Sequence, residues 1–67
     1  MQNSKFIEGV NILAKYIPED RKDSYDVNAE HDQLWFCQYD WVTDEKDKAR
    51  LEEIGWFEDE DSWSCWA

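Results

Sequence analysis

The chain has 67 residues, too few for two independent hydrophobic cores, so residues 1–67 are expected to form a single domain. Its 17 acidic residues against 7 Lys and Arg give a formal net charge of −10. This charge argues against direct binding to nucleic acid and against docking on an anionic membrane, because both need basic side chains. Aromatic residues make up 16% of the chain, which favours a folded domain over a disordered acidic chain.

The first predicted element is an amphipathic helix that ends before Pro18. Apolar residues recur at spacings of three and four between Phe6 and Ile17, which places them on one side of a helix. Asn3 or Ser4 can cap its first amides. Pro18 ends the helix because its ring disfavours helical backbone at the preceding residue. The charged segment 19–23 is then expected to be a loop.

A β-hairpin is predicted next. Residues 25–30 alternate apolar and polar side chains, the pattern of a strand with one buried face formed by Tyr25, Val27 and Ala29. Residues 31–33 are a polar turn. Residues 34–39 are apolar on both sides, as expected of a central strand that is covered on both faces and pairs with the first strand.

A second helix and a second hairpin complete the chain. Thr43 is expected to cap the helix, with acids in its first turn and docking through Leu51 and Ile54. Gly55 suits a left-handed C-terminal cap that returns Trp56 onto the helix. The hairpin has strands at 56–57 and 62–66, around an acidic turn at 58–61. The order α-β-β-α-β-β predicts an α+β domain, a four-stranded antiparallel sheet with two helices packed on it.

Two helices cannot cover both faces of such a sheet. Some Trp surface should therefore be exposed or covered by a second copy of the chain, so a homodimer through the uncovered sheet face is one alternative. The alternation predicts Trp35, Cys37 and Tyr39 on the face opposite Leu34 and Phe36. It also places Trp63 and Cys65 opposite Trp66.

The sequence carries neither an enzyme signature nor a cofactor motif, so we predict a non-enzyme without a cofactor. It has one histidine, His31, no G-x-S-x-G elbow, and two glycines that form no phosphate loop. A metal or redox site built from Cys37, Cys65 and His31 is an alternative, although the cysteines lack the close spacing of a zinc site. The N-terminus lacks a secretory apolar segment, which predicts a cytoplasmic protein with reduced thiols.

The distribution of acids and aromatic rings points to a protein partner. The acids form clusters at Glu58, Asp59, Glu60 and Asp61, at Asp40, Asp44, Glu45 and Asp47, and at Asp26, Glu30 and Asp32. Aromatic residues, common in binding hot spots, lie among them at Trp35, Tyr39, Trp41 and Trp63. Acids beside aromatic rings suit a basic surface, most often one that otherwise holds nucleic acid. The alternative is that the acids only maintain solubility and the rings only fill the core.

Three segments resemble small acidic phage and prophage proteins of unassigned function. They are Ala-Glu-His-Asp at 29–32, Leu-Glu-Glu-Ile-Gly-Trp-Phe at 51–57, and Asp-Glu-Asp-Ser-Trp at 59–63. The resemblance implies a setting in which small acidic proteins often inhibit host defence, among them anti-CRISPR and anti-restriction proteins that mimic DNA. The resemblance implies no particular target. Together with the acidic clusters, this setting leads us to expect a phage-type inhibitor in the host cytoplasm that occludes a basic surface of a host defence or nucleic-acid-handling complex. A housekeeping adaptor that binds through exposed Trp and Tyr side chains is the alternative.

Overall fold

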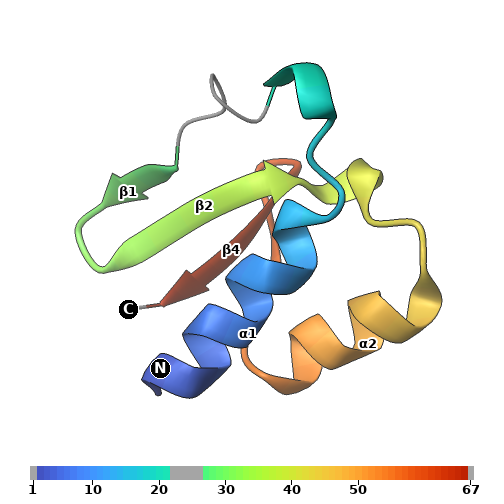
Figure 1. Cartoon of the computed structure of the whole chain (residues 1–67). Coiled ribbons are helices and arrows are strands. Elements are labelled where there is room, and N and C mark those ends of the chain that lie inside the picture. Colours follow the sequence, from blue (N-terminus) through green and yellow to red (C-terminus); the bar gives the residue numbers. More distant parts are fainter. Residues whose placement is uncertain (1, 22–26, 67) are drawn as a thin grey trace.

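Two helices lie on one side of a four-stranded antiparallel sheet in the computed structural model, which describes residues 2–21 and 27–66 (Figure 1). The spatial order of the strands is β1-β2-β4-β3. The predicted α+β class and element order are confirmed. The elements are α1 (Asn3–Ala14), the 3-10 turn η1 (Glu19–Arg21), β1 (Asn28–Glu30), β2 (Gln33–Gln38), the 3-10 turn η2 (Tyr39–Trp41), α2 (Glu45–Glu53), β3 (Phe57–Asp59) and β4 (Ser62–Trp66).

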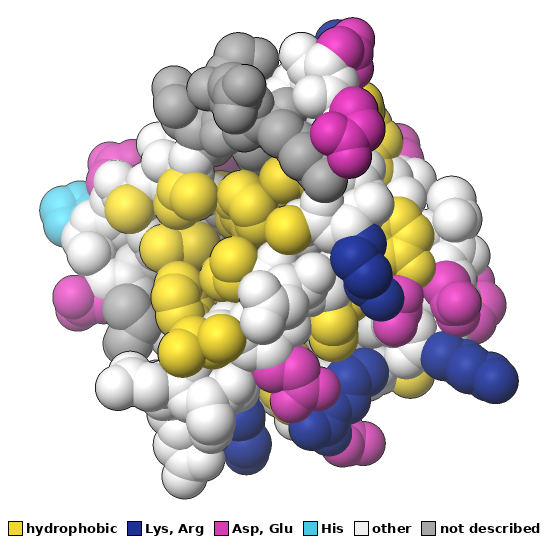
Figure 2. All heavy atoms as spheres, in the orientation of Figure 1, with side chains coloured by type: hydrophobic (Ala, Val, Ile, Leu, Met, Phe, Trp, Pro, Cys, Tyr) yellow, Lys and Arg dark blue, Asp and Glu magenta, His cyan; other side chains and the backbone are white. Residues whose placement is uncertain are grey.

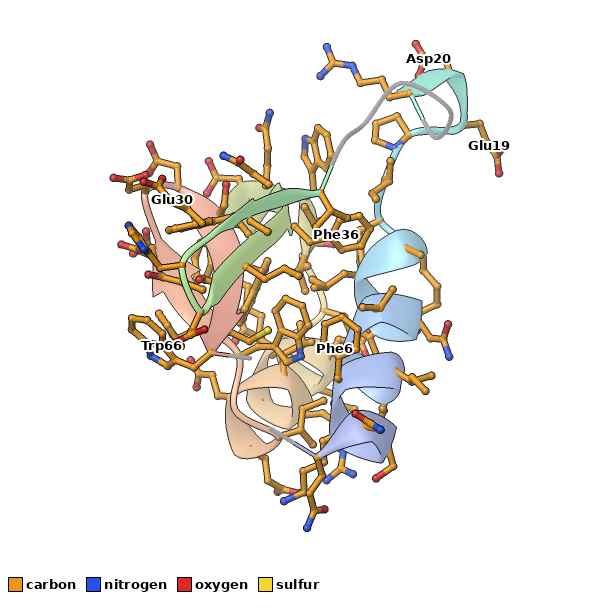
Figure 3. All side chains as sticks on the ribbon, turned by 90° about the vertical axis from the view of Figure 1, so that its left-hand side faces the viewer. Phe6, Glu19, Asp20, Glu30, Phe36 and Trp66 are labelled. Carbon is orange, nitrogen blue, oxygen red and sulfur yellow. The ribbon has the colours of Figure 1, made fainter. Side chains whose placement is uncertain are left out.

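The register of β2 and β4 separates the two faces of the sheet. Leu34 lies opposite Cys65 and Phe36 opposite Trp63, and these four side chains face the helices. Figure 3 shows Phe36 pointing toward α1, with Trp66 and Glu30 on the side of the sheet away from α1. We call this second side the open face.

The core lies between the helices and the sheet. Its largest fully buried side chains include Trp56 and Trp63, with Leu13 from α1 and Leu51 from α2 beside them. The other buried apolar residues are Ile17, Phe36, Cys37, Val42, Ile54 and Cys65. Both helices therefore contribute to one cluster with β2 and β4.

The end of α2 has the predicted geometry. Gly55 has a φ of 105°, and its amide donates to the Glu52 carbonyl at 3.2 Å. The amide of Trp56 donates to the Leu51 carbonyl at 2.8 Å, which completes a Schellman motif. This turn directs the Trp56 indole onto α1, where it stacks on Phe6 with ring centroids 6.1 Å apart.

Both helix N-termini differ from prediction. Gln2 is the N-cap of α1 and makes no side-chain cap bond, so Asn3 and Ser4 lie inside the helix. At α2 the cap is Asp44, whose side chain accepts from the Lys46 amide at 2.8 Å, and the prediction of Thr43 is wrong by one residue. Part of the expected loop at 19–23 forms η1, and residues 22–23 lie outside the described residues.

A β-bulge changes the faces of β2. The register shifts between Phe36 and Gln38, and Cys37 between them has a φ of 70°. Cys37 is fully buried in the core, and the chain leaves the strand after Gln38. Tyr39 consequently packs on Trp63, with centroids 4.8 Å apart. The prediction that Cys37 and Tyr39 share a face with Trp35 is therefore wrong.

The edge strand β1 has no buried face. Residues 28–30 are all exposed and Val27 is 51% exposed, which contradicts the expected buried face. The reason is that α1 packs on β2, one strand further in. Figure 2 shows hydrophobic side chains gathered at the surface over β1 and β2 and beside α1. Residues 25 and 26 lie outside the described residues.

A substitution at Gly9 tests the packing of Trp56 on α1. A Cβ atom at Gly9 would lie 2.0 Å from Nε1 of the buried Trp56. Alanine is ordinarily the better helix residue by about 1 kcal/mol, but here the overlap should outweigh that gain. We expect Gly9→Ala to lower the free energy of unfolding by about 1–3 kcal/mol in urea denaturation. Asn11→Ala, at an exposed position of α1, is the control and should not destabilise. A Gly9→Ala protein as stable as the parent would contradict the packing of Trp56 on α1.

Candidate acidic interface

Acidic and basic side chains are distributed unequally between the two layers. We call residues 27–38 and 57–66 the hairpin layer, and residues 2–21 and 39–56 the helical layer. The helical layer holds nine acids and six Lys and Arg residues. The hairpin layer holds no Lys or Arg and six acids, which are Glu30, Asp32, Glu58, Asp59, Glu60 and Asp61. In Figure 2 the dark-blue basic groups lie among magenta acids over the helices, while the side with the cyan histidine shows acids without bases.

Several Lys and Arg side chains of the helical layer form ion pairs with acids of the same layer. Arg50 of α2 contacts both carboxylate oxygens of Glu8 on α1, at 2.6 and 2.9 Å, and also pairs with Glu53. The hydrogen bond from Arg50 lowers the pKa of Glu8. Lys48 lies 3.7 Å from Glu45. These pairs cancel charge within the helical layer, whereas among residues 2–21 and 27–66 no Lys or Arg pairs with an acid of the hairpin layer.

Asp47 links α2 to the segment that directly follows α1. Its Oδ2 accepts from the Tyr16 hydroxyl at 2.5 Å and lies 3.5 Å from Lys15 Nζ. The bond from Tyr16 lowers the pKa of Asp47, and in return the carboxylate raises the pKa of Tyr16 to about 12. The structure therefore gives this predicted partner-binding residue a role within the protein.

The predicted acidic clusters lie at different places. Because β2 and β4 are antiparallel, the turn after Glu30 and the turn at Glu60 and Asp61 are at opposite ends of the sheet. The Asp61 carbonyl accepts from the Tyr39 amide at 2.8 Å, so η2 with Asp40 adjoins the second turn. The structure thus brings Asp40 beside the acidic turn at 58–61, while Glu30 and Asp32 stay apart. Asp44 and Glu45 mark the start of α2, and Asp26 lies outside the described residues.

The predicted aromatic site residues have different exposures. Trp63 is fully buried, so its assignment to partner binding is wrong, and its ring is part of the core. Trp35, Tyr39 and Trp41 are half-buried. Trp66, which the predicted site leaves out, is 58% exposed on the open face. The alternation in β4 already sets Trp66 apart from Trp63, so that signal was present in the sequence.

A hydrogen-bonded network covers the centre of the open face. Asp59 Oδ2 accepts from Gln33 Nε2 at 2.8 Å and from Trp35 Nε1 at 3.1 Å. Gln33 Nε2 also donates to Ser64 Oγ at 2.9 Å, and that hydroxyl donates to the Leu34 carbonyl at 2.9 Å. We call Gln33, Trp35, Asp59 and Ser64 the open-face network. Its bonds fix the position of the Asp59 carboxylate.

The residues of the metal or redox alternative are not arranged as a site. Cys37 and Cys65 are buried free thiols, and burial raises the pKa of Cys37 to about 12 and also raises that of Cys65. Both thiols are therefore protonated near neutral pH, and His31 is exposed in the β1–β2 turn. In residues 2–21 and 27–66, no three His, Cys, Asp or Glu side chains are grouped as metal ligands would be.

One shallow depression lies beside the open face. It has a volume of about 410 Å³ and is lined by Gln2, Lys5, Glu53, Ile54, Gly55 and Trp66. Its lining offers one basic and one acidic group beside apolar surface, and it contains neither of the thiols nor the histidine. Within the described part of the chain, neither helix is long and apolar enough to cross a membrane.

Asp47 provides a pH-dependent test of its structural role. A carboxylate with a lowered folded pKa stabilises the protein above its unfolded pKa of about 3.9, and that stability is lost as the pH falls through the folded value. Asp47→Asn should therefore lower the free energy of unfolding by about 1 kcal/mol at pH 7, and the difference should vanish near pH 2. Tyr16 gives a second effect at alkaline pH. Because its pKa is raised to about 12 in the folded protein, the free energy of unfolding of the parent should fall as the pH rises from 10 toward 12. Glu52→Gln removes an exposed acid on the same helix and keeps the Tyr16–Asp47 bond, so it should show no loss of stability at pH 7 and the same fall as the parent above pH 10. An Asp47→Asn loss that persists at pH 2 would contradict this account.

Comparisons of the chain with protein-family models, with curated proteins and with solved structures found no match. Function is therefore inferred from features of the molecule itself. These are an acidic hairpin layer without Lys or Arg, an exposed Trp66, and a positioned carboxylate on the open face.

Proposed function

We propose that the protein is a binding module whose hairpin layer contacts a basic surface of a partner protein. One observation supports this most directly. The hairpin layer carries six acids and no Lys or Arg, whereas the helical layer holds six bases, several of them in ion pairs. The protein thus has one side whose negative charge is not balanced locally. Such a side attracts a positively charged partner and speeds its association.

The proposed partner surface is one that otherwise contacts nucleic acid. Surfaces that bind phosphates are rich in Lys and Arg, and carboxylates at the two hairpin turns offer these bases an alternative partner. Bound there, the protein would exclude nucleic acid by charge and by bulk. It needs no catalytic group and no cofactor for this action, and it does not itself bind nucleic acid or membrane.

The resemblance of segments 29–32, 51–57 and 59–63 to phage and prophage proteins extends the proposal. On that basis the partner is a host complex for defence or for handling nucleic acid, and the protein is its inhibitor in the host cytoplasm. A second candidate is an adaptor that binds an apolar partner, which the 58% exposure of Trp66 favours. The two candidates differ in salt dependence, because exposed charges are screened over about 8 Å at physiological ionic strength whereas apolar contacts are not.

Two matched sets of substitutions test the proposal. The hairpin set is Glu30→Gln, Asp32→Asn and Glu60→Gln, and the helical set is Asp20→Asn, Glu45→Gln and Glu52→Gln. Each set removes three exposed charges and nearly preserves shape. Immobilised protein is loaded with a bacterial lysate treated with nuclease, and retained proteins are eluted as salt rises from ~0.05 to ~0.5 M. We expect the parent and the helical set to retain the same basic proteins, and the hairpin set to lose them.

Added duplex DNA should displace those proteins from the parent, since DNA and the hairpin layer would compete for the same bases. Amide proton spectra of both sets should match that of the folded parent. Retention of the partner by the hairpin set at every salt concentration would rule the proposal out. If Trp66→Ala abolished retention while salt had no effect, the adaptor would be the correct interpretation.

A further inference from the structure

The open-face network has used all its hydrogen-bond donors. The two hydrogens of Gln33 Nε2 point to Asp59 and Ser64, the Trp35 indole hydrogen points to Asp59, and the Ser64 hydroxyl points to the Leu34 carbonyl. The orientation of the Gln33 amide follows from chemistry, because a carboxylate accepts and only the NH2 group can donate to it. No further donor hydrogen is left in the network.

The atoms of the network that can still form hydrogen bonds are acceptor oxygens. Both bonds to Asp59 end on Oδ2, and among the described residues no hydrogen bond reaches Asp59 Oδ1 or Gln33 Oε1. Both side chains are only half-buried and so are accessible from the open face. A ligand that complements this surface must donate hydrogen bonds, and it gains most if it is a cation because Asp59 is a carboxylate.

Aromatic rings lie next to these acceptors. Trp66 pairs in register with Gln33, and Phe57 pairs with Ser64, so both belong to the open face. Their ring centroids are 6.2 Å apart at an angle of 33°. Because Trp66 is 58% exposed, part of its indole can receive a flat cation. Figure 3 shows its ring on the side of the sheet away from α1.

We propose that the open face binds an arginine side chain of the partner. The guanidinium stacks on the Trp66 indole and donates to Asp59 Oδ1 and Gln33 Oε1. Arginine fits better than lysine because its guanidinium is planar, carries five donors and no acceptor, and is weakly hydrated. The inference rests on the proposed function, since it identifies the chemistry that a basic partner offers to the hairpin layer.

A neighbouring acid on β1 strengthens the match in charge. Glu30 pairs in register with Gln33 on β1, and the hairpin layer has no Lys or Arg to repel the ligand. Lys5 of α1 lines the depression that also contains Trp66. The guanidinium is therefore placed over the part of the indole next to Gln33 and Phe57. A second copy of the chain is the poorer occupant, because two chains of charge −10 repel each other.

Two blocked tripeptides test this inference, acetyl-Gly-Arg-Gly-amide and acetyl-Gly-Lys-Gly-amide. They carry the same charge, and their dissociation constants can be measured from the indole N–H signals of Trp35 and Trp66 in proton–nitrogen spectra. We expect the arginine peptide to bind at least about threefold more tightly to the parent protein. Trp66→Ala and Asp59→Asn should each reduce this preference to about one. Glu30→Gln, the control, should weaken both peptides equally and leave the preference unchanged.

Equal binding of the two peptides by the parent, or a preference that survives in Trp66→Ala, would overturn the inference. Trp66 is exposed and Asp59→Asn is nearly isosteric, so both variants should keep the amide spectrum of the parent, which verifies their fold. The two proposals fail separately. If the peptides show no preference while the hairpin set still loses its basic partner, the arginine site is wrong and the acidic interface stands. If the preference is present but no basic partner is retained, the proposed function fails.

Discussion

The buried indole of Trp56 holds the two helices together. The left-handed turn at Gly55 directs this ring from the end of α2 onto α1, where only a glycine at position 9 leaves room for it. Arg50 and Glu8 join the same two helices at the surface. Because both helices are fixed on one side of the sheet, the core is a single apolar layer between the helices and the sheet. The other face of the sheet is consequently left to solvent or to a partner.

This arrangement also determines where the charge lies. Lys and Arg residues within the described ranges belong to the helical layer, and several pair there with acids from the other helix or from the same one. Within the part of the chain that the structure describes, the acids of the hairpin layer have no such partners, although self-repulsion at a net charge of −10 opposes folding of so small a domain. Around the exposed Trp66, the open face combines aromatic surface with a carboxylate held by two donors. The acidic side chains and the aromatic surface thus belong to the same layer, and the proposed basic partner would contact both.

The helices and the second hairpin could be predicted from the sequence because their local signals are strong. The spacing of apolar residues in α1 and the Gly55 cap of α2 gave the helices, and the acidic turn gave the second hairpin. The bulge at Cys37 could not be predicted, because a cysteine with positive φ has no recognisable local pattern and the burial of its side chain is decided by tertiary packing. In the sequence, the charge separation is visible only as an uneven number of acidic and basic residues in different segments. Its spatial form depends on pairs such as Arg50 with Glu8, 42 residues apart. Likewise, nothing local links Asp59 to Gln33 and Trp35, which only the sheet register brings together.

Charged paramagnetic cosolutes measure the local potential directly and so test the central claim, that the hairpin layer carries unbalanced negative charge. The relaxation of each backbone amide proton is recorded with a cationic and with an anionic nitroxide of the same size, and the ratio of the two enhancements reports the potential near that amide. The account predicts clearly higher cation-to-anion ratios at exposed amides of residues 28–33 and 57–61 than at exposed amides of α1 and α2. Equal ratios in the two layers, or higher ratios over the helices, would contradict it.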